Sequence, residues 1–144
     1  MPVIKVWCLP SGQTKDDLNR LHKAIVAAVV SIRELGLQSE NDMTCLFPPD
    51  LMKYGLGEEI IVEISGLFQK PERTQDVRQR LARNVGGVVK AFYHNAKIEC
   101  FVATIDPLDG FWASAESEPR EDKLPDDGHN FFDGVERGPR DPNK

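Results

Sequence analysis

The sequence has few of the residues from which most metal sites and cofactor-binding motifs are built. Its three histidines include no pair with metal-ligand spacing. Its three cysteines include no CxxC pair, which argues against a zinc site and against a disulfide framework. No phosphate-binding loop, dinucleotide fingerprint or GxSxG motif is present. We therefore expect a protein that works without a metal and without a cofactor.

Other absences concern location and partners. No apolar run approaches the ~20 residues of a membrane-spanning helix, and Lys5 interrupts the first apolar segment, so no secretory signal is expected. A net charge of −5 provides no basic surface for nucleic acid. Cys8, Cys45 and Cys100 fall in predicted strands, as buried thiols of a reducing compartment do. We expect a cytoplasmic protein whose partners include neither a membrane nor a nucleic acid.

The apolar residues alternate between the strand period and the helix period. This pattern predicts strands at residues 3–9, 43–47, 59–67 and 97–105. Helices are predicted to begin after the N-cap residues Thr14 and Thr74, and Asp17 forms a capping-box partner of the first cap. The predicted order is β-α-β, followed by β-α-β again.

The second unit repeats residues of the first unit as well as its pattern. Residues 14–21 and 74–81 share the pattern T-x-D-x-x-x-R-L, and the same offset matches Ile25 with Val85. We interpret this register as a tandem duplication, in which each crossover is right-handed and its two strands are parallel. The predicted fold is α/β (α+β), a four-stranded mixed sheet with two helices on one face.

The predicted domain covers residues 1–115, with repeats at about 2–57 and 58–114. Residues 116–144 are rich in Asp, Glu, Pro and Gly and lack periodicity, which predicts an extended or disordered acidic tail. The strand at 59–67 is apolar on both faces, whereas two helices cover only one face of a sheet. A copy of the same chain is the simplest cover for the other face, so we expect a homo-oligomer.

Pro2 opens the first predicted strand, and removal of Met1 would leave it as a secondary amine. This position, followed by tandem β-α-β units, resembles the tautomerase superfamily. PVIKVW from Pro2 is similar to the opening strand of its cis-3-chloroacrylic acid dehalogenase branch. PPDLMKYG from Pro48 is similar to the middle of its macrophage migration inhibitory factor branch. The segment from Asp106 through Gly110 to Trp112 is similar to the end of the same branch.

The resemblance implies a tautomerase fold, a homotrimer and an active site around the N-terminal proline near a subunit boundary. The implied substrate is a small 2-oxo or unsaturated carboxylic acid, and Pro2 is the implied catalytic residue. Arg73 lies in the loop where related enzymes hold the substrate carboxylate; its planar fork and the adjacent helix N-terminus both suit an anion. Lys70 is a second candidate, and Phe101 and Trp112 are candidates for an apolar pocket wall.

Three functions remain open at this point. A neutral Pro2 would act as the general base of a tautomerase, which is an isomerase. A protonated Pro2 would act as the general acid of a hydratase, dehalogenase or decarboxylase, and the third function is a non-enzymatic trimeric interaction protein. Val29 stands where the dehalogenase branch has His, and Val102 or Ala103 stands where that branch has Tyr. Gln13 stands where a paired arginine is expected. Proton shuttling needs fewer polar helpers, which favours the tautomerase. The sequence gives neither the exact substrate nor the fate of Met1.

Overall fold

A computed structural model of the chain describes residues 1–113. The chain divides into two units, Met1–Gly110 and Phe111–Lys144. The predicted acidic tail of residues 116–144 lies outside the described residues. The first unit contains all the helices and strands discussed below.

The predicted order of elements is confirmed, with strand ends that differ by up to two residues from the expected ones. The elements, in chain order, are β1 (Val3–Trp7), α1 (Lys15–Val30), η1 (Arg33–Leu35), η2 (Glu40–Asp42), β2 (Thr44–Leu46), β3 (Glu59–Phe68), α2 (Gln75–Phe92), β4 (Lys97–Ile105) and η3 (Pro107–Asp109), where η marks a 3-10 helix.

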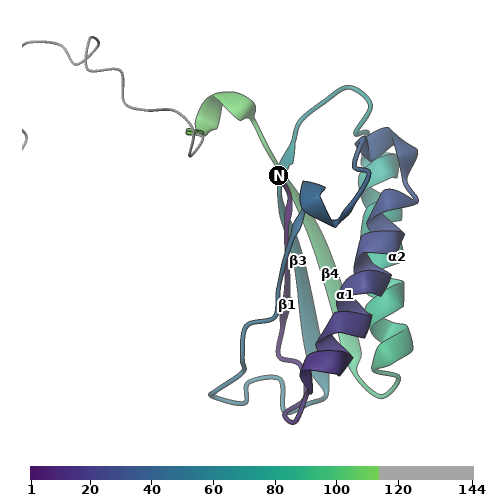
Figure 1. Cartoon of the computed structure of the whole chain (residues 1–144), viewed down its shortest axis with the longest axis vertical. Coiled ribbons are helices and arrows are strands. Elements are labelled where there is room, and N and C mark those ends of the chain that lie inside the picture. Colours follow the sequence, from purple (N-terminus) through teal and green to yellow (C-terminus); the bar gives the residue numbers. More distant parts are fainter. Residues whose placement is uncertain (114–144) are drawn as a thin grey trace, which may run out of the picture. The chain divides into compact units, whose positions relative to one another are not determined.

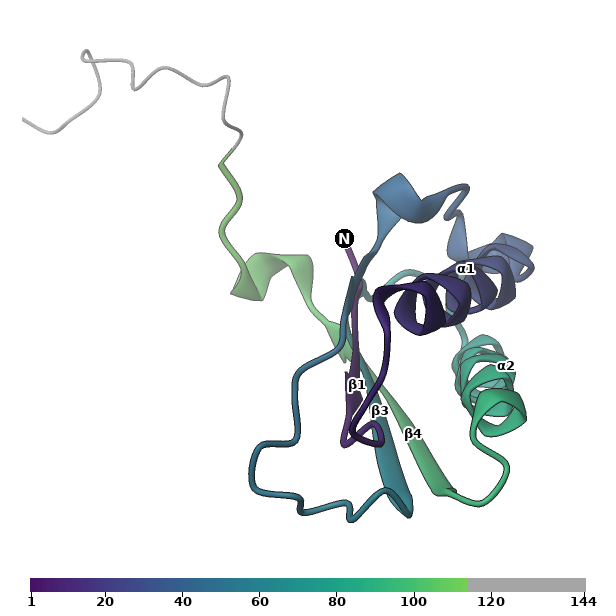
Figure 2. The ribbon, with the colours of Figure 1, turned by 60° about the horizontal axis from the view of Figure 1, so that its bottom comes forward.

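The sheet has the strand order β2-β1-β3-β4. Strands β1 and β2 are parallel, as are β3 and β4, whereas β1 and β3 are antiparallel. Two parallel β-α-β units are thus joined edge to edge through β1 and β3. Both helices cover the same face of the sheet (Figures 1 and 2). The predicted four-stranded mixed sheet with two helices on one face is confirmed.

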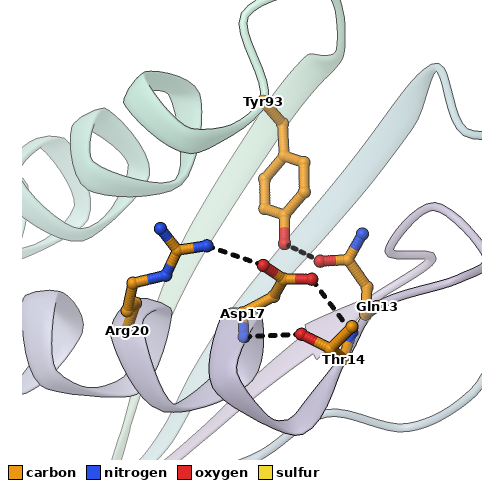
Figure 3. Close-up of polar contacts among 5 residues, drawn as sticks. All are labelled: Gln13, Thr14, Asp17, Arg20 and Tyr93. Carbon is orange, nitrogen blue, oxygen red and sulfur yellow. Dashed lines mark hydrogen bonds and ion pairs between the residues drawn. The ribbon is translucent and has the colours of Figure 1, made fainter.

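The two predicted N-caps begin the two helices. Thr14 and Asp17 form a reciprocal capping box at the start of α1, and Arg20 pairs with the Asp17 carboxylate at 2.7 Å (Figure 3). Thr74 Oγ1 accepts from the backbone N–H of Val77 at the start of α2. Such caps satisfy N–H groups that have no partner within the helix.

The two helices run antiparallel. Tyr93, which ends α2, donates its hydroxyl to Gln13, which precedes α1, at 2.7 Å (Figure 3). At the other end, Arg80 in α2 pairs with Glu34 beyond α1, also at 2.7 Å. Gln13, at the first-repeat position that matches Arg73, therefore holds the two helices together.

The core lies between the helices and the sheet. Its members are almost fully buried apolar side chains from all the main elements except β2 and β4, whose half-buried residues pack against it. Cys45 and Cys100 are such residues, and burial raises the pKa of each thiol to about 11. Cys8 is an exception to the predicted strand placement, because it follows β1 in a bend with a φ of 66°.

The opposite face of the sheet carries large apolar side chains among charged ones. Trp7, Leu46 and Phe101 are exposed there. Trp7 donates its indole N–H to Glu63 at 2.8 Å. Lys97 forms an ion pair with Glu99, its neighbour in β4 on this face. No element of the described residues covers this face. Within those residues, no helix is long and apolar enough to cross a membrane.

Candidate active site

Pro2 lies at the start of β1 and is buried. Its carbonyl accepts from the backbone N–H of Thr44 at 2.9 Å, which ties it to β2. The preceding Met1 is 62% exposed, and its sulfur accepts from the Thr44 hydroxyl at 3.2 Å. Pro2 is thus buried at the head of β1, while the residue before it is largely exposed.

A bulge in β3 makes room beside Pro2. The pairing of β3 with β4 shifts register between Ile64 and Leu67, and Gly66 within this bulge has a φ of +72°. A Cβ at Gly66 would lie 3.1 Å from the Met1 carbonyl oxygen and 3.8 Å from Pro2 Cα. Both the left-handed backbone and the close approach require glycine. A glycine inside an apolar strand pattern is the sequence signal that points to such a bulge.

A cavity of about 250 Å³ opens beside Pro2. It brings together Pro2 and Arg73, two residues that the sequence predicts to act together. Its lining is Met1, Pro2, Leu37, Asn41, Asp42, Gly66, Phe68 and Arg73.

Arg73 reaches the cavity from the loop before α2 and is only 7% exposed. Its two terminal nitrogens donate to the carbonyls of Phe68 at 2.9 Å and Leu35 at 2.7 Å. Its Nε has no hydrogen-bond partner, and none of the ion pairs among the described residues includes it. Burial lowers the pKa of the guanidinium, against a smaller opposing effect of Glu72. An arginine nevertheless stays charged in proteins, so a buried cation with unused N–H donors lines the cavity.

Asp42 supplies a negative charge to the same cavity. It ends η2, and its Oδ2 accepts from the backbone N–H groups of Gln38 at 2.7 Å and Ser39 at 3.0 Å. Sequence reasoning did not identify it, although Ser39 and Asp42 have the spacing of a capping box. The cavity therefore contains a fixed carboxylate as well as a fixed guanidinium.

The other three predicted site residues do not line this cavity. Lys70 lines a different hollow, and Phe101 is 57% exposed on the open sheet face. Trp112 belongs to the second unit, Phe111–Lys144. Their predicted roles in substrate binding stay predictions. Among the described residues, no group of three or more His, Cys, Asp or Glu side chains could hold a metal ion.

Solved structures with the same fold come from several proteins. Macrophage migration inhibitory factor from Toxoplasma gondii has 15% sequence identity and a TM-score of 0.57, with 80% of this chain and 97% of that chain covered. Malonate semialdehyde decarboxylase has 14% sequence identity and a TM-score of 0.55, with 78% of this chain and 92% of that chain covered. A fused 4-OT, described as an asymmetric trimer, has 17% sequence identity and a TM-score of 0.57, with 76% of this chain and 91% of that chain covered.

No protein-family model and no curated protein matches the chain. The three structural neighbours all belong to the tautomerase superfamily. At these identities the likeness establishes the fold, and it agrees with the resemblance seen in the sequence. The first unit of this chain, two β-α-β repeats with Pro2 at the head of β1, has the tautomerase fold.

Proposed function

We propose that the protein is a cofactor-independent tautomerase, an isomerase that interconverts the keto and enol forms of small 2-oxo or dienol carboxylic acids. The observation that carries this proposal is that Pro2 and the buried Arg73 line one cavity. A base and a fixed cation at one cavity are what proton transfer on a small carboxylic acid requires.

Pro2 is the proposed general base. While Met1 is attached, the Pro2 nitrogen is a tertiary amide and cannot accept a proton, so the reaction requires removal of Met1. The resulting amine has an ordinary pKa of about 7.7–8.0. Burial and the nearby positive charge of Arg73 both favour the neutral form. That form takes the proton from the carbon next to the carbonyl and returns it at the other end of the enol system.

Arg73 is the proposed carboxylate ligand. Two of its N–H groups are held by the carbonyls of Phe68 and Leu35, which fix the guanidinium plane, and the remaining donors are available for a carboxylate. An incoming carboxylate would also neutralise a buried positive charge that has no ion-pair partner among the described residues. Binding energy of this kind orients the substrate and contributes to KM more than to kcat.

Asp42 favours a second candidate reaction. A carboxylate at the cavity stabilises the protonated amine, so Pro2 would serve as a general acid in hydration, dehalogenation or decarboxylation. One structural neighbour is a malonate semialdehyde decarboxylase described with decarboxylase and hydratase activities. An Asp42→Asn variant separates the two reactions, because it should lower the pKa of the Pro2 amine. More of the amine would then be neutral, which should raise the activity of a tautomerase and lower that of an enzyme in which Pro2 is the general acid. An NMR pH titration of the amine measures this pKa directly.

A homotrimer is also proposed, because the open sheet face presents Trp7, Leu46 and Phe101 and because fused 4-OT structures are trimers. Phe101 would then reach an active site only across a subunit boundary. Sedimentation velocity should give the mass of three chains. A monomeric but active protein would contradict the trimer without affecting the role of Pro2.

The proposed function is tested with the enol form of phenylpyruvate, whose ketonisation is followed by ultraviolet absorbance. Intact-mass analysis first establishes that Met1 is absent. The wild type should accelerate ketonisation, and Pro2→Ala should lower kcat/KM by at least roughly 100-fold. The exposed Pro107, changed to Ala, is a matched control and should retain activity. Equal rates in the wild type and Pro2→Ala would rule out Pro2 as the base.

A further inference from the structure

The cavity beside Pro2 contains few side chains that can donate a hydrogen bond. Of the eight residues that line it, only Arg73 and Asn41 have N–H groups in their side chains. We propose that Asn41 binds the carbonyl oxygen of the 2-oxo acid and stabilises the negative charge that develops there during the reaction. This inference rests on the tautomerase function proposed above, and it names the residue that recognises the oxo group of the substrate.

The proposed reaction places negative charge on this oxygen. When Pro2 takes the proton from the carbon next to the carbonyl, the electron pair of the broken C–H bond forms a C=C bond. The π pair of the carbonyl group moves onto its oxygen, which becomes an enolate oxygen. Pro2 then gives its proton to this oxygen, and the enol results. A hydrogen-bond donor at the oxygen lowers the barrier, because its bond to the charged oxygen is stronger than its bond to the neutral carbonyl.

Asn41 has a fixed backbone and an unused side chain. It lies in η2, where its backbone N–H donates to Ser39 Oγ at 3.2 Å. The turn is also held by the Asp42 carboxylate, which accepts from the backbone N–H groups of Gln38 and Ser39. Within residues 1–113, by contrast, the side-chain amide of Asn41 forms no hydrogen bond. Its two donors are therefore free for a ligand in the cavity.

The other polar side chains of the cavity do not suit this role. The Asp42 carboxylate is an acceptor and would repel an enolate oxygen. Arg73 is the proposed ligand of the carboxylate, and two of its nitrogens already donate to backbone carbonyls. The carboxylate and the carbonyl of a 2-oxo acid are on adjacent carbons. Because Arg73 is buried and Asn41 is exposed, the carboxylate would lie at the inner end of the cavity and the carbonyl nearer its opening.

Asn41→Ala tests the proposal in the ketonisation of enol phenylpyruvate, which passes through the same transition state as enolisation. We expect kcat to fall roughly 10- to 100-fold, since an exposed donor should contribute less than one in a dry site. KM should stay within about threefold, because the ground state makes the weaker bond. The matched control is Asn84→Ala, at an exposed position of α2 that does not line the cavity, and it should keep wild-type kcat.

Two further readouts separate a donor from a structural residue. Urea unfolding of Asn41→Ala should match that of the wild type, because the amide has no partner to lose within residues 1–113. Asn41→Asp keeps the shape of the side chain but replaces its donors with a charged acceptor, so it should lower kcat at least as much as Asn41→Ala. Wild-type kcat in either Asn41 variant would overturn the inference. The role of Pro2 would still stand if Pro2→Ala lost activity.

A binding measurement decides the inference without turnover. Phenylpyruvate and 3-phenylpropionate differ only in the oxo group, and calorimetry compares their affinities in Pro2→Ala and in the double variant with Asn41→Ala. With Asn41 present, the 2-oxo acid should bind about fivefold more tightly, the effect of one hydrogen bond. Without Asn41 this preference should disappear. A preference that persists, or a failure of both acids to bind, would overturn the inference. An inactive wild type would refute the tautomerase, yet this comparison would still show whether Asn41 binds the oxo group.

Discussion

Replacing Arg73 by Met tests structure and function at one position. The substitution keeps an unbranched side chain but removes the donors to the carbonyls of Phe68 and Leu35, at 2.9 and 2.7 Å. A hydrogen bond from a charged donor contributes about 1.5–3 kcal/mol, so the gross loss is about 3–6 kcal/mol. The substitution also removes a buried cation whose desolvation lowers its pKa, and this offsets part of the loss. We expect a net decrease of about 2 kcal/mol in the free energy of unfolding.

The functional effect of Arg73→Met should be larger than the structural one. Loss of the carboxylate ligand should lower kcat/KM roughly 100-fold, mainly through KM, because the carboxylate is not the reacting group. Arg73→Lys keeps the charge but not the planar guanidinium, so it should lower kcat/KM only roughly tenfold. The matched control is Arg80→Met, because Arg80 lies within α2 and forms exposed ion pairs with Glu34 and Asp76. It should change KM little.

Urea unfolding measures the first effect, and ketonisation of enol phenylpyruvate measures the second in conditions where each variant is folded. An unfolding free energy that does not change in Arg73→Met would mean that removal of the buried charge offsets the two carbonyl bonds in full, and it would refute the expected net loss of stability. A folded Arg73→Met protein with wild-type KM would refute the assignment of Arg73 as the carboxylate ligand. The two readouts are independent, so either part of the reasoning can fail alone.

Three further predictions concern the helices and the thiols. Gly87→Ala should stabilise α2 by about 1 kcal/mol in urea unfolding, because a Cβ there meets nothing. Gly86→Ala should raise the unfolding free energy clearly less, because its Cβ would lie 3.2 Å from the Cβ of Cys100. Equal stabilisation by the two substitutions would contradict the close approach of Gly86 to Cys100. Hydrogen bonds from the Thr14 backbone and side chain, and then from Arg20, lower the pKa of Asp17. The contribution of Asp17 to stability is therefore present above the ordinary carboxyl pKa and is lost as the pH falls through the lowered value. Asp17→Asn should flatten this acid dependence of the unfolding free energy, and an unchanged profile would contradict it. With pKa values of about 11, Cys45 and Cys100 should react slowly with iodoacetamide near pH 8 until the protein is unfolded, and rapid labelling of the native protein would contradict their burial.

Much of the fold is predictable from the sequence because its signals are local or periodic. The two Thr caps mark the helix starts within one residue, and the alternating apolar pattern locates the strands. The prediction for Cys8 is wrong because the apolar pattern continues past the end of β1, where the chain already turns with a positive φ.

The candidate site is predictable only in part. Pro2 and Arg73 stand out through a resemblance and a shared register, and they line one cavity. Gly66 and Asp42 have only weak local signals, because their importance depends on which backbone atoms lie across from them. Lys70, the second candidate after Arg73 in the sequence, does not line this cavity but a different hollow.

By itself, the sequence determined the order of helices and strands, the tandem repeat and the two residues most suited to the proposed chemistry. The order and the repeat follow from caps and periodicity, which act over a few residues, whereas Pro2 and Arg73 are indicated by the resemblance to a family. The tertiary structure decided which charges share a cavity. That outcome depends on the antiparallel pairing of β1 with β3, which sets the bulge at Gly66 against Pro2. Such contacts join residues far apart in the chain, and no local pattern specifies them.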